Sequence, residues 1–112
     1  MIRIERHPLV RRDLRELARH VVEVSGDLRA AERRLDQVDA LLADILTNPH
    51  SGANLSEKLP GWRVRHGGAG RRITIVFRLT EAGGCLQIAL VAFGGQNWTD
   101  TAPDRSEAFT ED

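Results

Sequence analysis

The stretch WRVRHGGAGRRITIVFRL, residues 62–79, decides the fold of this chain. Two runs that alternate apolar and polar residues, 62–66 and 72–79, flank the glycine-rich segment 67–70. Alternation with a period of two is typical of β-strands, and a short connection rich in glycine is typical of a hairpin. A third apolar run, 85–93, follows a second glycine-bearing connection. The sequence therefore predicts three consecutive antiparallel strands.

Upstream of these strands, apolar residues recur at helical spacing in two segments. A first helix is predicted to begin at His7-Pro8 and to end at Ser25-Gly26-Asp27, where Asp27 can cap a second helix. The second helix is predicted to end at Thr47-Asn48-Pro49, because the residue before a proline is disfavoured in a helix. Helices joined by so short a turn run antiparallel. The expected apolar stripes are Leu9, Val10, Leu14, Leu17, Val21 and Val22, and then Leu28, Ala31, Leu35, Val38, Leu42 and Ile45.

The remaining segments complete the predicted architecture. Alternating apolar and charged residues at 2–5 predict a short N-terminal strand, and residues 50–60 are expected to form a loop. The expected fold class is α+β, in the order β-α-α-β-β-β: an N-terminal strand, an antiparallel two-helix hairpin and a three-stranded antiparallel meander. We expect a single domain over residues 1–98, followed at 99–112 by a flexible acidic tail with little to bury.

Composition narrows the class of protein. The chain has 112 residues, which suits one domain, and no apolar run approaches the length of a membrane span. A single cysteine and the lack of a signal-peptide pattern lead us to expect a cytoplasmic protein without a membrane partner. Residues 54–98 contain six basic and two acidic side chains, although the chain as a whole has zero net charge. A basic segment indicates an acidic or phosphate-bearing partner, and a solvated sheet face is the alternative.

Strand alternation also predicts the side of the sheet on which each residue lies, because successive residues face opposite sides. We assume that the most apolar set of each strand packs against the helices. The residues then expected to face the helices are Trp62, Val64, Ile73, Ile75, Phe77, Leu79, Leu86, Ile88, Leu90 and Ala92. Those expected on the opposite side are Arg63, Arg65, Arg72, Thr74, Val76, Arg78, Gln87, Ala89, Val91 and Phe93.

Four arginines are thus predicted to converge on one side of the sheet, around an apolar centre. Such a centre is too apolar for a solvated face, so we expect it to bind a nucleic-acid strand, an acidic peptide or an amphipathic segment. The alternative is a face buried by the chain's own tail or by dimerisation. The arginines are Arg63, Arg65, Arg72 and Arg78, and the apolar residues are Val76, Val91 and Phe93.

Motifs for catalysis or metal binding are weak. The four histidines have no metal-ligand spacing with one another or with the cysteine, so we expect no metal and no cofactor. Cys85 is interpreted as a small buried strand residue. A strand rather than a helix follows Gly67-Gly68-Ala69-Gly70, which favours a hairpin turn over a phosphate-binding loop. His66 beside the arginines is the one histidine kept as an acid/base candidate.

The order of elements and two motifs resemble those of the RelE/ParE superfamily, the small toxins of type II toxin–antitoxin pairs. The motifs are Leu59-Pro60-Gly61-Trp62-Arg63-Val64-Arg65 and Gly70-Arg71-Arg72-Ile73-Thr74-Ile75-Val76-Phe77-Arg78. The resemblance covers roughly residues 2–98 and implies a cognate antitoxin whose acidic or amphipathic segment masks the toxin. It also implies one of two activities. RelE-like members cleave mRNA in the ribosome, whereas ParE-like members inhibit DNA gyrase; such pairs are associated with plasmid stabilisation.

Residue by residue, the resemblance favours the ParE-like class. Arg63, Arg65 and Arg72 match the first three cations of RelE-like nucleases, but the further arginine falls at Gln96, and the chain contains no tyrosine to match their C-terminal one. General acid–base help is worth about 10²–10⁴-fold in rate, and His66 is the only substitute. We therefore expect a gyrase inhibitor; an mRNA endonuclease and a non-toxic binding module are the alternatives. The expected partner-binding residues are Arg63, Arg65, Arg72, Arg78, Phe93, Gln96 and Trp98, and the catalytic set of a nuclease would be Arg63, Arg65, Arg72 and His66.

Overall fold

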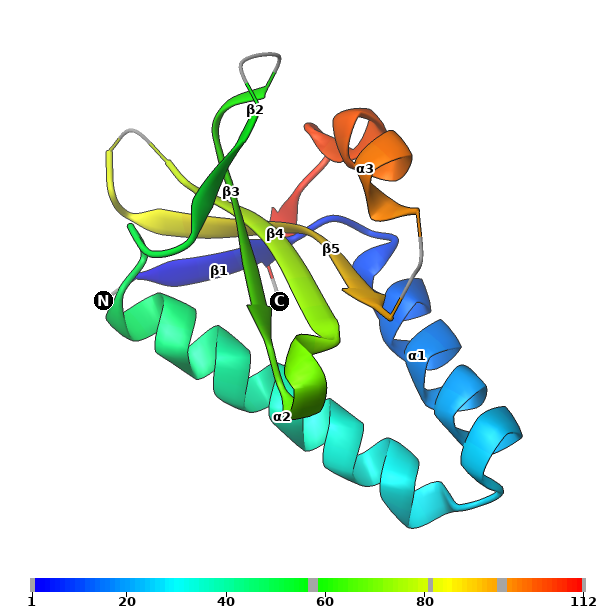
Figure 1. Cartoon of the computed structure of the whole chain (residues 1–112). Coiled ribbons are helices and arrows are strands. Elements are labelled where there is room, and N and C mark those ends of the chain that lie inside the picture. The colour runs from blue at the N-terminus through cyan, green and yellow to red at the C-terminus, as the bar shows by residue number, and fades with distance from the viewer. Residues whose placement is uncertain (1, 57–58, 81, 95–96, 112) are drawn as a thin grey trace.

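The computed structural model describes residues 2–56, 59–80, 82–94 and 97–111, and shows a mixed sheet covered on both faces (Figure 1). Within these residues the strand order is β2-β3-β4-β5-β1-β6. The elements are β1 (Arg3–Arg6), α1 (Val10–Ser25), α2 (Leu28–Thr47), β2 (Ala53–Ser56), β3 (Leu59–Gly67), the 3₁₀ turn η1 (Ala69–Arg71), β4 (Ile73–Leu79), β5 (Cys85–Phe93), α3 (Trp98–Thr101), the 3₁₀ turn η2 (Ala102–Arg105) and β6 (Thr110–Glu111).

The predicted α+β architecture is confirmed. β3, β4 and β5 form the antiparallel meander, and β1 pairs with β5 in parallel. The helical hairpin also forms as expected: the carboxylate of Asp27 accepts the backbone N–H of Arg29 at 2.9 Å, and α2 ends at Thr47. α1 begins three residues later than predicted, at Val10, because Nδ1 of His7 accepts the N–H of Leu9 in a turn that precedes the helix. None of the helices in the described part of the chain combines the length and apolar character that a bilayer crossing requires.

The hairpin turn extends past the sheet, which changes the predicted core (Figure 1). Leu28, expected on the apolar stripe of the second helix, is 71% exposed, and Val24 on the other side of the turn is 75% exposed. Leu9 is also exposed. The stripes are buried only where the sheet lies beneath them, so the residues nearest the turn remain in solvent. The buried helix residues are Val10, Leu17, Val21, Ala31, Val38, Leu41, Leu42 and Ile45.

Residues 50–60, predicted to be a loop, include an additional strand. β2 pairs antiparallel with β3, with Ala53 opposite Val64 and Asn54 opposite Arg63. The strand contains only four residues, and although Ala53 and Leu55 alternate with Asn54 and Ser56, a run this short does not distinguish a strand from a loop. β2 forms one edge of the sheet, which makes β3 an interior strand.

β3 presents its two faces opposite to the prediction. Its pairing with β4 places Arg65 opposite Ile75, which belongs to the core cluster beneath the helices, and Arg63 shares that side of the strand. Trp62 and Val64 instead join a second apolar cluster on the far side of the sheet. Alternation identifies which residues share a face. It does not identify the face when apolar segments cover both sides.

A β-bulge in β5 changes the alternation of that strand. Val76 pairs with Leu90 and Phe77 pairs with Ile88, so Ala89 is an extra residue between the two pairs. Leu86 and Ile88 face the helices as predicted, but the residues after the bulge exchange sides. Val91 and Phe93 therefore face the helices, and Ala89, Leu90 and Ala92 face the far side, which corrects the predicted placement of all but Ala89.

The far side of the sheet is covered by residues 97–111. Ala102 is buried there, and the ring centroid of Phe109 lies 5.6 Å from that of Trp62. Trp98 packs against the same cluster. The expectation that residues from 99 onward bury little is therefore wrong, and the alternative of a face buried by the chain's own tail is confirmed.

A buried ion pair joins this C-terminal segment to α1 at the bulge. Arg105 donates to both carboxylate oxygens of Asp13, and both side chains are largely buried. Asp13 also accepts the backbone N–H of Val91 at 3.0 Å, and Arg105 donates to the carbonyl of Ala89 at 3.2 Å. The pair thus satisfies the carbonyl of the extra residue Ala89 and the N–H of Val91, two residues after it. Nε of Arg105 is also buried, and it has no hydrogen-bond partner among the described residues.

Replacing Arg105 with methionine should lower the free energy of unfolding by about 3–5 kcal/mol, because the Asp13 carboxylate would stay buried without its cation. The double variant Asp13→Leu/Arg105→Met should recover part of that loss, since no unpaired charge remains. Arg19→Ala, which breaks an exposed pair with Glu16, is the control and should cost less than about 1 kcal/mol. Urea denaturation measures all three; equal losses for Arg105→Met and Arg19→Ala would contradict the role given to the buried pair.

His7 should make stability depend on pH. Burial lowers the pKa of His7 below 6.5, and Arg105 nearby lowers it further, whereas Asp13 opposes this. Since the folded state prefers the neutral ring, this stabilisation is complete above pH 6.5 and is lost as the pH falls through the lowered pKa. His7→Asn keeps an acceptor for the N–H of Leu9 without a titratable ring, so its unfolding free energy should fall less between pH 7.5 and 5.5 than that of the wild type. The exposed His50→Asn is the control, and identical pH profiles for all three proteins would refute the assignment.

Candidate functional site

The structure does not bring the four predicted arginines together. Arg65 forms an ion pair with Asp44 of α2 on the helix side of the sheet. Arg63 donates to the carbonyl of Gly52 at 3.2 Å. Arg78 lies on the far side, with its guanidinium carbon 4.5 Å from the centroid of Trp62, and it also donates to the Gln87 side chain. The predicted convergence on one face is therefore wrong.

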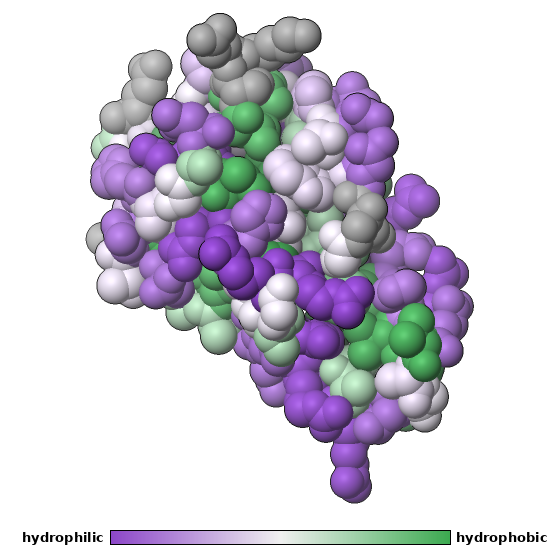
Figure 2. All heavy atoms as spheres, viewed as in Figure 1, coloured by the Kyte–Doolittle hydropathy of each residue, from purple (hydrophilic) through white to green (hydrophobic). Residues whose placement is uncertain are grey.

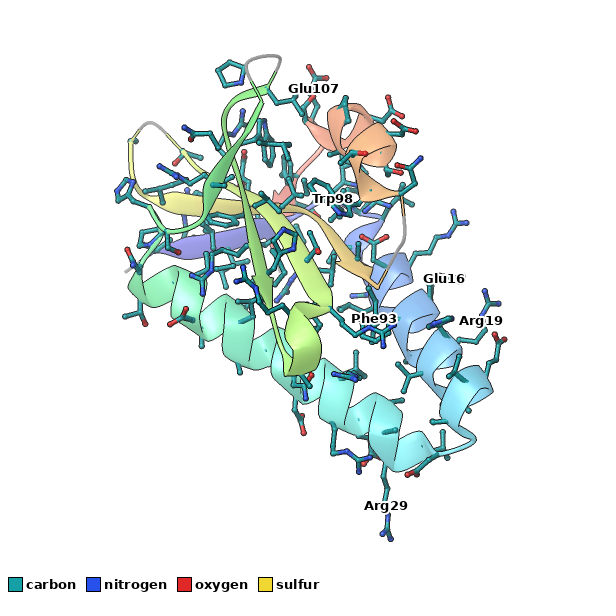
Figure 3. The ribbon with its side chains drawn as sticks, in the orientation of Figure 1. Glu16, Arg19, Arg29, Phe93, Trp98 and Glu107 are labelled. Carbon is teal, nitrogen blue, oxygen red and sulfur yellow. The ribbon has the colours of Figure 1, made fainter. Side chains whose placement is uncertain are left out.

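The other predicted site residues are also distributed over the fold. His66 is exposed, with Nδ1 2.8 Å from the hydroxyl of Thr74 and its ring centroid 6.2 Å from that of Trp98. Trp98 begins α3 on the far side of the sheet, well away from Phe93 at the end of β5 (Figure 3). Gln96 lies outside the described residues. Cys85 is buried in β5, as predicted, and no group of metal-ligating side chains occurs in the part of the chain that the structure describes.

Arg72 and Phe93 meet at a cleft between the two helices and the end of the sheet. We call this the hairpin cleft and define it by Val21, Val24, Ala30, Arg34, Arg72 and Phe93; its volume is about 310 Å³. Figure 2 shows hydrophobic side chains between the two helices, bordered by hydrophilic ones. Phe93 points into the angle between the helices (Figure 3).

Local backbone geometry sets Arg72 at this cleft. The turn after β3 passes close to α2, where the side chain of Gln37 accepts the N–H of Ala69 at 3.2 Å. Gly68 has a φ of +74°, and a Cβ there would lie 2.9 Å from the same Gln37 oxygen, so only glycine fits this turn. The carbonyl of Arg72 then accepts the N–H of Gly94 at 2.8 Å. These contacts fix the start of β4 beside the end of β5.

Two guanidinium groups lie over the Phe93 ring. The Arg34 carbon is 5.3 Å from the ring centroid and the Arg72 carbon is 5.1 Å from it, both within cation–π range. Arg34 also donates to the side-chain oxygen of Gln37 at 2.9 Å. Over the described ranges, no carboxylate lies within ion-pair distance of Arg34 or Arg72. Two cations beside an apolar surface form a site for an anionic group.

The arrangement is suited to binding rather than to chemistry. Among the described residues that line the cleft, His20 is the one whose side chain is of a type that commonly serves as a general acid or base. Its ring centroid lies 5.9 Å from that of Phe93. The two arginines can hold and orient an anion, because a guanidinium group offers hydrogen-bond donors and no acceptor.

Arg34 was missed from the sequence, although its spacing gives a signal. It lies three residues after Ala31 and four before Val38, both of which are buried on the core side of α2. A charged residue at a stripe position of an amphipathic helix faces the core or a cleft rather than open solvent. Asp13 has the same property in α1, between the buried Val10 and Leu17.

Comparison with known proteins agrees with this fold. A family model described as "ParE toxin of type II toxin-antitoxin system, parDE" matches residues 4–98. Among solved structures, the chain is similar to the E. coli toxin RelE, determined as an arginine-to-alanine double mutant in the free state. The TM-score is 0.61 and the sequence identity is 14%, over 96% of this chain and 100% of that chain, which shows a shared fold alone. A search of curated proteins gives no significant match.

The family match extends over most of the chain. It begins in β1, includes both helices and the meander, and ends at the first residue of α3. The resemblance to the RelE/ParE superfamily predicted from the sequence is therefore confirmed. The chain belongs to the family of ParE toxins of type II toxin–antitoxin systems.

Proposed function

We propose that this toxin arrests growth by binding DNA gyrase, and that it does not cleave mRNA. The family places the chain in a toxin–antitoxin system, with a cognate antitoxin as its partner. The choice of gyrase as the target rests on the separation of the arginines that a RelE-like nuclease would use.

That separation follows from the register of β3 and β4. Arg65 lies opposite Ile75 within β4, whereas Arg72 precedes that strand and has helical backbone angles (φ −88°, ψ −9°) at the end of η1. The guanidinium of Arg65 is bound to Asp44 and that of Arg72 lies over Phe93, so the two are held by different neighbours. A phosphoryl transition state needs its cations preorganised around one group of oxygens. The arrangement therefore supports binding of a protein target over cleavage of a phosphodiester.

The protonation chemistry supports the same choice. The chain contains no tyrosine, and Nδ1 of the exposed His66 is directed at the hydroxyl of Thr74. Arg72 is at the opposite end of the short connection that follows β3, beside Phe93. His66 and the arginines are thus not arranged around one position where a substrate could bind, as general acid–base catalysis requires.

The purified chain should inhibit DNA supercoiling by purified gyrase and should leave mRNA intact in a reconstituted translation system. Expression without the antitoxin should give filamentous cells with damaged DNA. The triple variant Arg63→Ala/Arg65→Ala/Arg72→Ala separates the two activities further, because loss of a phosphate clamp would remove any ribosome-dependent cleavage.

Each outcome has a distinct meaning. Cut mRNA that disappears in the triple variant, together with normal supercoiling, would replace the gyrase proposal by a RelE-like nuclease. Normal growth, normal supercoiling and intact mRNA would identify a binding module of the same fold without toxicity.

A further inference from the structure

The outer face of α1 carries a row of exposed arginines that lies outside the hairpin cleft. We call this row the arginine stripe; its members are Arg11, Arg12, Arg15 and Arg19. At about 100° per residue, the four side chains fall within an arc of about 100° on the side of the helix away from its buried residues. Figure 3 shows Arg19 pointing away from the sheet. The stripe is therefore open to a partner along the length of α1.

Most of the charge of the stripe is not neutralised within the fold. Arg19 forms ion pairs with Glu16 and Glu23. The third acidic residue of α1, Asp13, is buried and paired with Arg105. The other three members of the stripe form no ion pair within the described ranges. Three guanidinium groups are thus presented to solvent without a carboxylate.

This placement does not favour the helix itself. Arg11 and Arg12 lie in the first turn of α1, where the partial positive charge of the helix N-terminus disfavours cations. Arg15 lies four residues after Arg11 and four before Arg19, and like charges at that spacing repel each other. Since the stripe opposes the stability of α1, we look for its role in an anionic partner that neutralises it.

The surface suits a phosphate backbone better than an acidic protein. The large apolar side chains that are exposed in the described part of the chain are Leu9, Val24 and Leu28, and none of them belongs to the stripe. A protein interface has an apolar core in addition to its charged rim, whereas contacts with phosphates require cations and other donors alone. The stripe offers charge without an apolar centre, which favours a nucleic acid.

The helical presentation favours duplex DNA over duplex RNA. The rise of about 1.5 Å per residue places Arg11, Arg15 and Arg19 about 6 Å apart in a row along the helix axis. The major groove of B-DNA admits an α-helix, so such a row can follow the phosphates that border it. The major groove of A-form RNA is too deep and narrow for side chains to read.

We propose that the arginine stripe of α1 binds the phosphate backbone of duplex DNA. Its unneutralised guanidinium groups donate charge-assisted hydrogen bonds to phosphate oxygens and release counterions, so the contact does not depend on base sequence. The DNA contact goes beyond the binding of gyrase and is tested without that enzyme. Its setting, the DNA segment that gyrase holds, rests on the proposed function.

The test measures binding of the purified full-length chain to a short fluorescent DNA duplex by anisotropy. With three phosphates neutralised, affinity should fall about 40-fold between about 50 and 200 mM salt, a logarithmic slope of about −2.7. The triple variant Arg11→Gln/Arg12→Gln/Arg15→Gln should bind weakly and lose most of this slope. Its urea midpoint should equal or exceed that of the wild type, because the replaced charges oppose the helix.

A matched control removes the same charge elsewhere. Arg29, Arg33 and Arg71 are exposed and lie outside the stripe, so their triple replacement by glutamine should retain the wild-type affinity and salt slope. A second variant, Arg15→Glu, places a carboxylate four residues before Arg19. It should stabilise α1 while it weakens DNA binding, which a loss of folding would not produce.

Every outcome bears on the assignment. An unchanged salt slope in the stripe variants, or an equal loss in the control, would overturn it. Tighter binding to duplex RNA, or equal binding to polyglutamate, would replace DNA by another polyanion and also overturn it. Gyrase inhibition by a wild-type chain that does not bind DNA would overturn the DNA contact alone. DNA binding without gyrase inhibition would uphold the contact and overturn the proposed function.

Discussion

The buried ion pair between Asp13 and Arg105 joins three parts of the chain that are far apart in sequence. One partner comes from α1 and the other from η2, and both also bond to the backbone of β5, Arg105 at the extra residue Ala89 and Asp13 at Val91. A buried pair of this kind contributes little net stability compared with apolar residues of the same size, because both charges must be desolvated. Its role here is to provide hydrogen-bond partners for backbone groups at the bulge, where the regular hydrogen bonding between the strands is interrupted.

The bulge in turn determines what each face of the sheet presents. Before it, Leu86 and Ile88 face the helices; after it, Val91 and Phe93 take that side. Phe93 thereby comes to lie at the open end of the helical hairpin, where Arg34 and Arg72 approach its ring. Without the extra residue, the same sequence would direct Phe93 toward the C-terminal segment.

The second covered face explains why the arginines are separated. Residues 97–111 bury the far side of the sheet around Trp62 and Val64, so the alternating arginines of β3 are left on the helix side near the sheet edge. There Arg65 finds Asp44 and does not join Arg72. Arginines that lie close together in the sequence of this chain thus occupy different environments in its structure. Positive charge is instead concentrated at the hairpin cleft, where Arg34 and Arg72 lie together.

The sequence alone determined the elements and their order, because these depend on local physics. Asp27 and Gly26 separate the helices, Pro49 ends the second, period-two alternation indicates β3 and β4, and an apolar run after a glycine-bearing connection indicates β5. The α+β class and the RelE/ParE resemblance followed from these features. Tertiary structure decided on which side of the sheet each strand residue lies. Whether Arg63 or Trp62 meets the helices depends on strand register and on a C-terminal cover whose burial comes from Arg105, Ala102 and Phe109, three residues without a periodic pattern. Alternation fixes side chains relative to their neighbours in one strand, whereas the direction toward a distant helix is set only when register, bulge and cover form together.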